Sequence, residues 1–378
     1  MTPGLKDAAL ALEARLAEIT GRRYCVMTSR STAALYLAFH SLAPHPGRIV
    51  FPAILCPSPV YAALYAGHQP AFCDVDRKTG NMDPAALESL LAETPNVVAV
   101  MPTHLYGQPA RMEEICAVAH AHNVAVVEDL AQALGATMPN GGATGCFGIC
   151  SVLSFGHTKI IDAGYGGALV TDDKELAMNI RNAEAQLSEP TRDRGTLAAT
   201  YSTDYYRIRD AAVTDPRAHD EFLSFPARFR PLYLDRFDTA RAAAINQALN
   251  GLKQTLEARR RKAAIYDQKL TGVLDPLHRD PGSAPWRYSV HLPPGNQVTL
   301  TDGLRDSGFD ASNWYPSLHR WFEAGRKQGE KSLDRALVHE SSVLNLWLDD
   351  STDDDRVSAC AEKLVMLAEQ TQTSMATP

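Results

Sequence analysis

A lysine at the end of a short apolar segment constrains this sequence more than any other feature. Residues 151–155 have the apolar pattern of a buried strand, and the polar turn after them presents Lys159. Glycines then lead into a second apolar strand at 168–171. Because burial disfavours the charge of an ammonium group, a lysine at such a strand end is suited to form an imine. The alternative is a solvated lysine in a surface turn, and the upstream segments decide between the two.

Short apolar strands alternate with helices before this lysine. Strands are predicted at 24–27, 48–51, 71–75, 96–101 and 124–127, and helices at 3–20, 32–42, 61–65 and 112–122. A further helix begins at Pro84, where Asp83 is a suitable cap. This alternation is typical of an α/β protein with a mostly parallel sheet covered by helices on both faces.

The C-terminal part predicts a second, smaller α/β domain. After a helix at 173–184, residues 188–230 are rich in Arg, Asp and Tyr and show no clear periodicity. We interpret them as an insertion, either a solvated surface loop or a lid or partner-contacting loop. A long helix at 236–270 leads to strands at 288–292 and 343–348 and to helices at 300–307 and 356–369. The expected domains are 1–240 and 241–378.

Charge and cysteine usage exclude several classes of partner. The net charge of −7 argues against nucleic acid or an anionic membrane surface as the main partner. We expect no leader and no membrane span, because no apolar run has the required length or flanks. The seven cysteines are odd in number and lie mostly in apolar patterns, which favours free thiols in a reducing cytoplasm. Cys146 and Cys150 have no partner pair at ligand spacing, so no metal site is expected.

Three segments carry groups that suit one cofactor. Residues 28–32 join a strand to a helix, so backbone N–H groups and the hydroxyls of Ser31 and Thr32 would hold a phosphate. Asp129 follows a buried strand and would pair with a protonated pyridine nitrogen, while Gln132 would reach the ring hydroxyl. Ser154 adds a phosphate donor near the lysine turn. Each segment alone also fits ordinary helix capping, but their order along an α/β chain points to pyridoxal phosphate.

Motifs spread over nearly the whole chain carry a more specific resemblance. They are STAAL at 31–35, HLYGQP at 104–109, EDLAQALG at 128–135, SFGHTK at 154–159 and, more loosely, WYPSLH at 314–319. The sequence resembles the DegT/DnrJ/EryC1/StrS family of fold-type-I pyridoxal phosphate enzymes, the sugar aminotransferases. The resemblance implies a mostly parallel, seven-stranded sheet between helices.

The resemblance also implies roles for individual residues. Lys159 would form the Schiff base with the cofactor and move the proton, and Asp129 would pair with the ring nitrogen. Ser31, Thr32, Gln132 and Ser154 would bind the cofactor. The motif positions His104, Tyr315 and His319 are candidate substrate residues. The family is typically homodimeric with shared active sites, so a homodimer is expected.

Four positions differ from the family pattern. Cys56 stands where the family places an aromatic ring over the cofactor, so Cys56 packs against the ring or stacking comes from elsewhere. Leu234 replaces an Asn offered to the neighbouring subunit's phosphate, Ser31 replaces a Gly, and Tyr165 replaces a Glu. These changes concern cofactor seating, substrate space and the dimer contact, and we expect the substrate to differ from the common nucleotide-linked sugars.

The leading hypothesis is a cytoplasmic aminotransferase that moves an amino group from an amino acid, with glutamate expected, to a keto-sugar or similar acceptor. One alternative is another pyridoxal phosphate reaction on an amino acid or small metabolite. The other is a non-catalytic relative with a regulatory or binding role. Retention of Lys159, Asp129 and Gln132 weighs against that last possibility, whereas the changes at Cys56 and Leu234 favour it.

Overall fold

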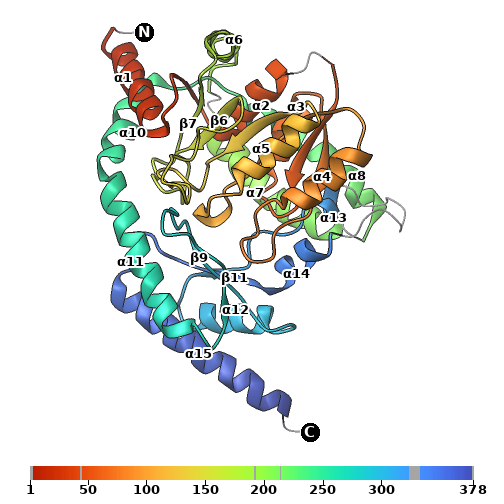
Figure 1. Cartoon of the computed structure of the whole chain (residues 1–378), viewed down its shortest axis with the longest axis vertical. Helices are drawn as coiled ribbons and strands as arrows, with labels where there is room; N and C mark the ends of the chain where they lie inside the picture. The colour runs from red at the N-terminus through yellow and green to blue at the C-terminus, as the bar shows by residue number, and fades with distance from the viewer. Residues whose placement is uncertain (1–2, 43–44, 191–192, 213, 323–332, 377–378) are drawn as a thin grey trace.

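Two sheets joined by a long helix form the protein (Figure 1). The computed structural model describes residues 3–42, 45–190, 193–212, 214–322 and 333–376. The larger sheet has seven strands in the order β1-β7-β6-β5-β4-β2-β3. Their bounds, in that order, are Tyr24–Thr28, Gly167–Thr171, Cys150–Ser154, Ala125–Asp129, Val97–Val100, Arg48–Pro52 and Gln69–Cys73. Only β7 runs antiparallel to its neighbours, so the predicted α/β fold with a mostly parallel seven-stranded sheet is confirmed.

Alternation along the central strands sorts side chains into two layers. In β5, Val126 packs with the helices α4 (Pro84–Glu93) and α5 (Met112–Ala121), whereas Val127 packs into the larger core on the opposite face. Val50 and Phe51 divide in the same way in β2. Because side chains alternate across a strand, strands buried on both faces are apolar throughout, which is why they were recognisable in the sequence.

Helices cover both faces of this sheet. Those of the N-terminal part are α1 (Pro3–Thr20), α2 (Ser31–Leu42), α3 (Ser58–Tyr65), α4 (Pro84–Glu93), α5 (Met112–Ala121) and α6 (Lys174–Glu184). The predicted cap of α4 is confirmed, since the Asp83 carboxylate accepts hydrogen bonds from the backbone N–H groups of Ala85 and Ala86.

Most of the described part of the interval 188–230 is helical, so the prediction that it is a loop without regular structure is wrong. It forms α7 (Arg194–Ala212) and α8 (Pro216–Arg228), which pack against each other, followed by the short α9 (Arg230–Tyr233). Residues 191, 192 and 213 lie outside the described part. The helices meet through aromatic rings, with Tyr201 5.3 Å from Phe225 and Tyr205 6.5 Å from Phe222 between ring centroids. These rings recur at helical spacing, but the many charged residues between them masked the pattern.

The C-terminal part builds the smaller sheet. The predicted long helix is divided into α10 (Ala242–Ala248) and α11 (Leu252–Leu270), which run along one side of the molecule in Figure 1. The sheet has the order β10-β11-β9-β8, with bounds Ala311–Ser312, Val343–Leu346, Tyr288–His291 and Asp275–Pro276. The accompanying helices are α12 (Gln297–Asp306), α13 (His319–Phe322), α14 (Asp334–Ser342) and α15 (Asp354–Ala376).

The two parts share packing across the predicted boundary at 240. Trp286, Tyr315 and Leu318 belong to the core of the larger sheet although they come from the C-terminal part. A separate core holds α11, α12 and α15 against the smaller sheet. The division into 1–240 and 241–378 stays a prediction.

Candidate active site

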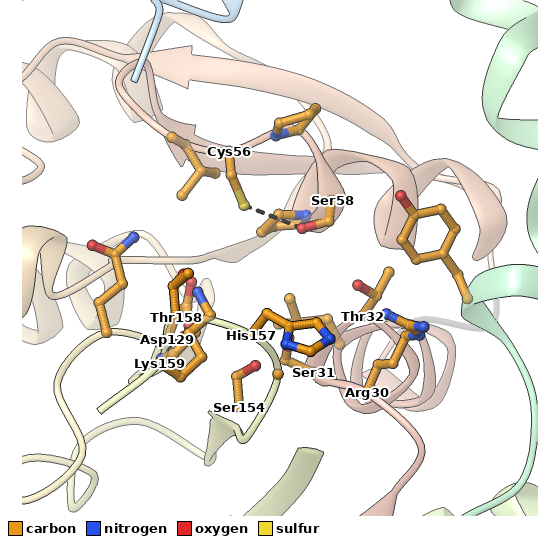
Figure 2. Close-up of a pocket in the computed structure, with 18 of the residues that line it drawn as sticks. Arg30, Ser31, Thr32, Cys56, Ser58, Asp129, Ser154, His157, Thr158 and Lys159 are labelled. Atoms are coloured by element: carbon orange, nitrogen blue, oxygen red, sulfur yellow. Dashed lines mark hydrogen bonds between the residues drawn. The ribbon is translucent and has the colours of Figure 1, made fainter. Parts of the chain in front are cut away.

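A cavity of about 350 Å³ lies at the carboxyl ends of β1, β5 and β6. All seven residues predicted to bind a cofactor line it, together with Tyr315: Ser31, Thr32, Cys56, Asp129, Gln132, Ser154 and Lys159. Figure 2 shows Asp129 and Lys159 towards one side of the pocket and Arg30, Ser31 and Thr32 towards the other, with Ser154 between them. Parallel strands bring these groups together because their carboxyl ends share one edge of the sheet.

Asp129 is a buried carboxylate at the base of this cavity. Its Oδ1 accepts a hydrogen bond of 2.8 Å from the N–H of Ala131, and Thr103 Oγ1 donates to Oδ2 at 3.4 Å. Burial raises the pKa of Asp129, and the hydrogen bonds and the nearby Lys159 ammonium only partly oppose that rise. A charged carboxylate in this place calls for a cationic partner. A protonated pyridine nitrogen has the chemistry to provide one.

The turn at the start of α2 has the donors that a phosphate requires. Ser31 and Thr32 open the helix and line the cavity, so their hydroxyls and free N–H groups are available beside the Ser154 hydroxyl. Gly167 at the start of β7 fixes the turn, because a Cβ there would lie 2.3 Å from the carbonyl carbon of Arg30 and from the nitrogen of Ser31. This donor set fits the phosphate of pyridoxal phosphate.

Lys159 follows a residue with unusual backbone geometry. Thr158 has φ +66°, a left-handed conformation that is uncommon outside glycine and asparagine. The carbonyl of Thr158 accepts a hydrogen bond from the indole Nε1 of Trp286 in the C-terminal part. The Lys159 Nζ lies 5.7 Å from the centroid of the same indole ring. Trp286 therefore holds the turn that presents the amine, a contact that the sequence did not predict.

Cys56 faces the cavity with a neutral thiol. Its Sγ lies 3.1 Å from Ser58 Oγ, and Figure 2 shows this pair across the pocket from Ser154. Burial raises the pKa of the Cys56 thiol, and the Lys159 ammonium opposes the rise.

Aromatic residues supply much of the remaining wall. They are Tyr165, Tyr201, Tyr205, Tyr206, Tyr233, Trp286, Trp314 and Tyr315. Four of them come from α7 and α9, so the segment predicted to be an insertion forms part of the cavity. The sequence signal was present as three tyrosines at 201, 205 and 206, but only the helical arrangement turns them towards the site.

Gln132 lines the cavity and forms hydrogen bonds with two tyrosines. Its Oε1 accepts a hydrogen bond of 2.9 Å from the N–H of Tyr106, and its Nε2 donates to the Tyr315 hydroxyl at 3.1 Å. The amide is thereby oriented with its donor side towards the cavity wall.

The substrate role predicted for His104 is not supported by its position. It is fully buried outside the described lining of the cavity. Its Nδ1 accepts the N–H of Ala110 at 2.9 Å, so the ring proton is on Nε2, which donates to Glu128 at 2.8 Å. Burial by itself would raise the pKa of Glu128, but hydrogen bonds from His104, the Gly145 N–H and Ser151 Oγ outweigh it and leave that pKa lowered. His104 therefore supports the fold behind the cavity.

His319 also lies outside the described lining, whereas Tyr315 belongs to it. The Nδ1 of His319 is 2.7 Å from Ser317 Oγ, and burial lowers the pKa of the imidazole. The prediction of His319 as a substrate residue is not supported by this position. Of the departures from the family pattern, Tyr165 lines the cavity and Leu234 is buried in the main core.

The described residues also bear on metal and membrane partners. Within the described residues, no three His, Cys, Asp or Glu side chains cluster as a metal site. No described helix is both long and apolar enough to cross a membrane.

Comparison with known proteins gives this arrangement its context. The chain matches the DegT/DnrJ/EryC1/StrS aminotransferase family over residues 6–365. It is 37% identical over 181 residues to GDP-perosamine synthase of Caulobacter vibrioides, an alignment spanning 48% of each chain. It is 30% identical over 304 residues to the pleiotropic regulatory protein of Geobacillus stearothermophilus, covering 80% of this chain and 71% of that protein.

A solved structure agrees over most of the chain. DesI, crystallised in the presence of its TDP-sugar product, has 25% identity and a TM-score of 0.77, covering 98% of this chain and 87% of that one. The family resemblance carried by the motifs is thus confirmed, and the chain belongs to the DegT/DnrJ/EryC1/StrS aminotransferase family.

Proposed function

We propose that this chain is a pyridoxal phosphate-dependent aminotransferase that moves an amino group from an amino acid to a keto-sugar acceptor. One observation carries the proposal: Lys159, Asp129 and the hydroxyls of Ser31, Thr32 and Ser154 line one cavity. Bound pyridoxal phosphate supplies an aldehyde for attachment of an amine and a ring that accepts electrons from the reacting carbon.

The chain's own groups then have distinct tasks. Lys159 attaches the cofactor and carries the proton to and from the reacting carbon. Asp129 keeps the ring nitrogen protonated, and Gln132 orients the ring oxygen. Cys56 would face the bound ring, and Tyr315 would contact the acceptor. The buried position of Asp129 supports its assignment, because a cationic partner offsets the unfavourable burial of its charge.

The acceptor and donor classes follow from the relatives and from the wall of the cavity. GDP-perosamine synthase and the TDP-sugar product of DesI support a sugar acceptor. The tyrosines of α7 and α9 suit the apolar face of a sugar ring, since aromatic rings pack against C–H groups. Glutamate is the proposed donor.

We further propose a cytoplasmic homodimer with shared active sites. Leu5 and Leu10 are exposed on α1 and offer an apolar contact surface. The seven described cysteines are free, which supports a reducing compartment. Sedimentation velocity on the purified protein tests the dimer, and a monomer at micromolar concentration contradicts it.

Trapping the covalent attachment tests the central assignment. Borohydride reduction after incubation with pyridoxal phosphate is expected to convert the imine, formed with loss of water, to a secondary amine, which adds the cofactor's mass less one oxygen atom to the peptide containing Lys159. Lys159→Ala should abolish this label and amino transfer, whereas Lys174→Ala, at an exposed position on α6, should change neither. Labelling of other lysines without Lys159 rejects the proposal.

A regulatory role is the second candidate, favoured by the similarity to the pleiotropic regulatory protein. Incubation with glutamate separates the two. An aminotransferase releases 2-oxoglutarate in an amount equal to the bound cofactor, and a purely regulatory protein releases none.

A further inference from the structure

The cavity contains a cation that the proposed function leaves without a task. Among the described lining residues, the fixed charges at neutral pH are those of Arg30, Asp129 and Lys159. The proposed function pairs Asp129 with the ring nitrogen and attaches the cofactor to Lys159. A phosphate group adds about −1.5 to −2 charges, which hydroxyl and N–H donors solvate but do not neutralise.

Arg30 lies at the end of the cavity where the phosphate donors gather. It immediately precedes Ser31, the first residue of α2, and Figure 2 shows its side chain beside Thr32 on the side away from Lys159 and Asp129. The side chain is half-buried. Burial raises the pKa of Tyr233 to about 12, while a hydrogen bond from Tyr201 and the Arg30 guanidinium oppose the rise, so the guanidinium lies near that wall of the cavity.

The backbone of Arg30 is fixed in place. Its carbonyl accepts a hydrogen bond of 2.9 Å from Thr28 Oγ1, and the residue forms an isolated bridge with Gly166. The close approach of Gly167 to the same peptide leaves little freedom for the turn. This backbone holds the start of the side chain at the phosphate end of the cavity, and the planar fork of a guanidinium loses less entropy per hydrogen bond than a flexible ammonium when it binds an anion.

We infer that Arg30 is a cofactor-binding residue that neutralises and hydrogen-bonds the phosphate group of pyridoxal phosphate. The inference rests on the proposed function and adds the charged contact that the hydroxyl cradle lacks. It separates the cofactor's two ends: Arg30 acts on the phosphate, and Lys159 and Asp129 act on the ring.

Comparing two ligands isolates the phosphate contribution. Apoprotein is titrated with pyridoxal phosphate and with pyridoxal, which lacks the phosphate, and binding is followed by visible absorbance and by quenching of tryptophan fluorescence. Arg30→Gln should weaken the binding of pyridoxal phosphate about 10- to 100-fold, the range for a hydrogen bond to a charged group. The affinity for pyridoxal should change by no more than about twofold. Arg30→Lys should recover part of the loss. Arg217→Gln, at an exposed position on α8, is the matched control and should change neither affinity.

Each outcome has a definite reading. Retained pyridoxal binding shows that the Arg30→Gln cavity is intact, so a selective loss of pyridoxal phosphate supports the inference. Equal losses for both ligands, or unchanged pyridoxal phosphate affinity with a raised KM for glutamate, overturn it. If the parent protein binds pyridoxal phosphate and Arg30→Gln binds it equally well, only this inference fails. If the parent binds none, the proposed function fails as well.

Discussion

Glu128 and Asp129 are neighbours in the sequence, yet β5 turns them to opposite faces of the sheet. Glu128 points to the side of Val126, where His104, Ser151 and backbone N–H groups surround it. Asp129 ends the strand at the cavity, where fewer donors reach it. One carboxylate is therefore fully solvated by the protein, and the other is left for a ligand.

Glu128→Gln should lower the free energy of unfolding by about 3 kcal/mol at neutral pH, because the amide cannot accept from all the donors that face the carboxylate. The pKa of Glu128 is lowered in the folded protein, so its stabilisation is complete above the unfolded pKa and is lost as the pH falls through the folded value. The difference in the free energy of unfolding between parent and variant should accordingly become smaller at acid pH. Urea unfolding across pH measures this.

The control for that experiment is Glu88→Gln, whose pair with His122 lies near the surface. It should change stability by less than about 0.5 kcal/mol. A Glu128→Gln protein as stable as this control at neutral pH would contradict the interpretation.

The types and order of residues along the chain predicted which side chains would line the cavity. Imine formation, pairing with the ring nitrogen and phosphate binding each require particular kinds of side chain. Residue types and order did not indicate that His104 and His319 lie outside the described lining. Both lie in motifs that resemble the family, but a motif does not indicate whether a side chain faces the site or the packing behind it. Trp286 and Tyr233 were missed because their places depend on contacts between distant segments, whereas Arg30 lies within the predicted phosphate turn at 28–32 and only its side chain was overlooked.

At the scale of elements, β7 brings its first residues against the N-terminus of α2. The antiparallel direction of β7 places Gly166 and Gly167 beside the turn of Arg30 and Ser31. The paired glycines were visible in the sequence as a turn signal, but their contact with a segment more than a hundred residues away was not. The helices α7 and α8 were likewise unpredicted, because their apolar face consists of widely spaced aromatic rings among charges.

Gly167→Ala should displace the turn at the start of α2 and weaken pyridoxal phosphate by at least tenfold, with a loss of about 1–3 kcal/mol in stability. Retention of the cofactor during gel filtration measures the loss of binding, and thermal unfolding measures the loss of stability. Gly156→Ala is a matched control on the same cavity, because its added Cβ would meet nothing closer than Ser154 Oγ at 3.7 Å. Equal cofactor retention and equal thermal stability in the two variants would rule out a steric conflict at Gly167.

At the scale of the whole molecule, the N- and C-terminal parts are joined by close backbone contacts. The N–H of Ala284 donates to the Gly107 carbonyl at 3.0 Å, and the N–H of Trp286 donates to the Tyr106 carbonyl at 2.9 Å. Sequence periodicity predicted each part, but nothing local in the sequence specifies how the parts meet.

Gly107→Ala should destabilise the protein more than backbone strain alone explains. Gly107 has φ +85°, and a Cβ there would lie 1.7 Å from the Ala284 carbonyl oxygen. Gly295→Ala isolates the strain, because Gly295 has φ +81° and no atom near its added Cβ. We expect a loss of about 1 kcal/mol at 295 and about 1–3 kcal/mol more at 107, measured by urea unfolding. Similar losses at the two positions would exclude a steric conflict.

The indole Nε1 of Trp286 donates a hydrogen bond to the carbonyl of Thr158, immediately before Lys159. The reactive amine is consequently coupled to the C-terminal half through a single peptide unit. Were the smaller sheet to swing about α11, either the amine would travel with it or that indole contact would break first. A displacement of the smaller sheet that keeps the indole contact would therefore also move the backbone that presents Lys159.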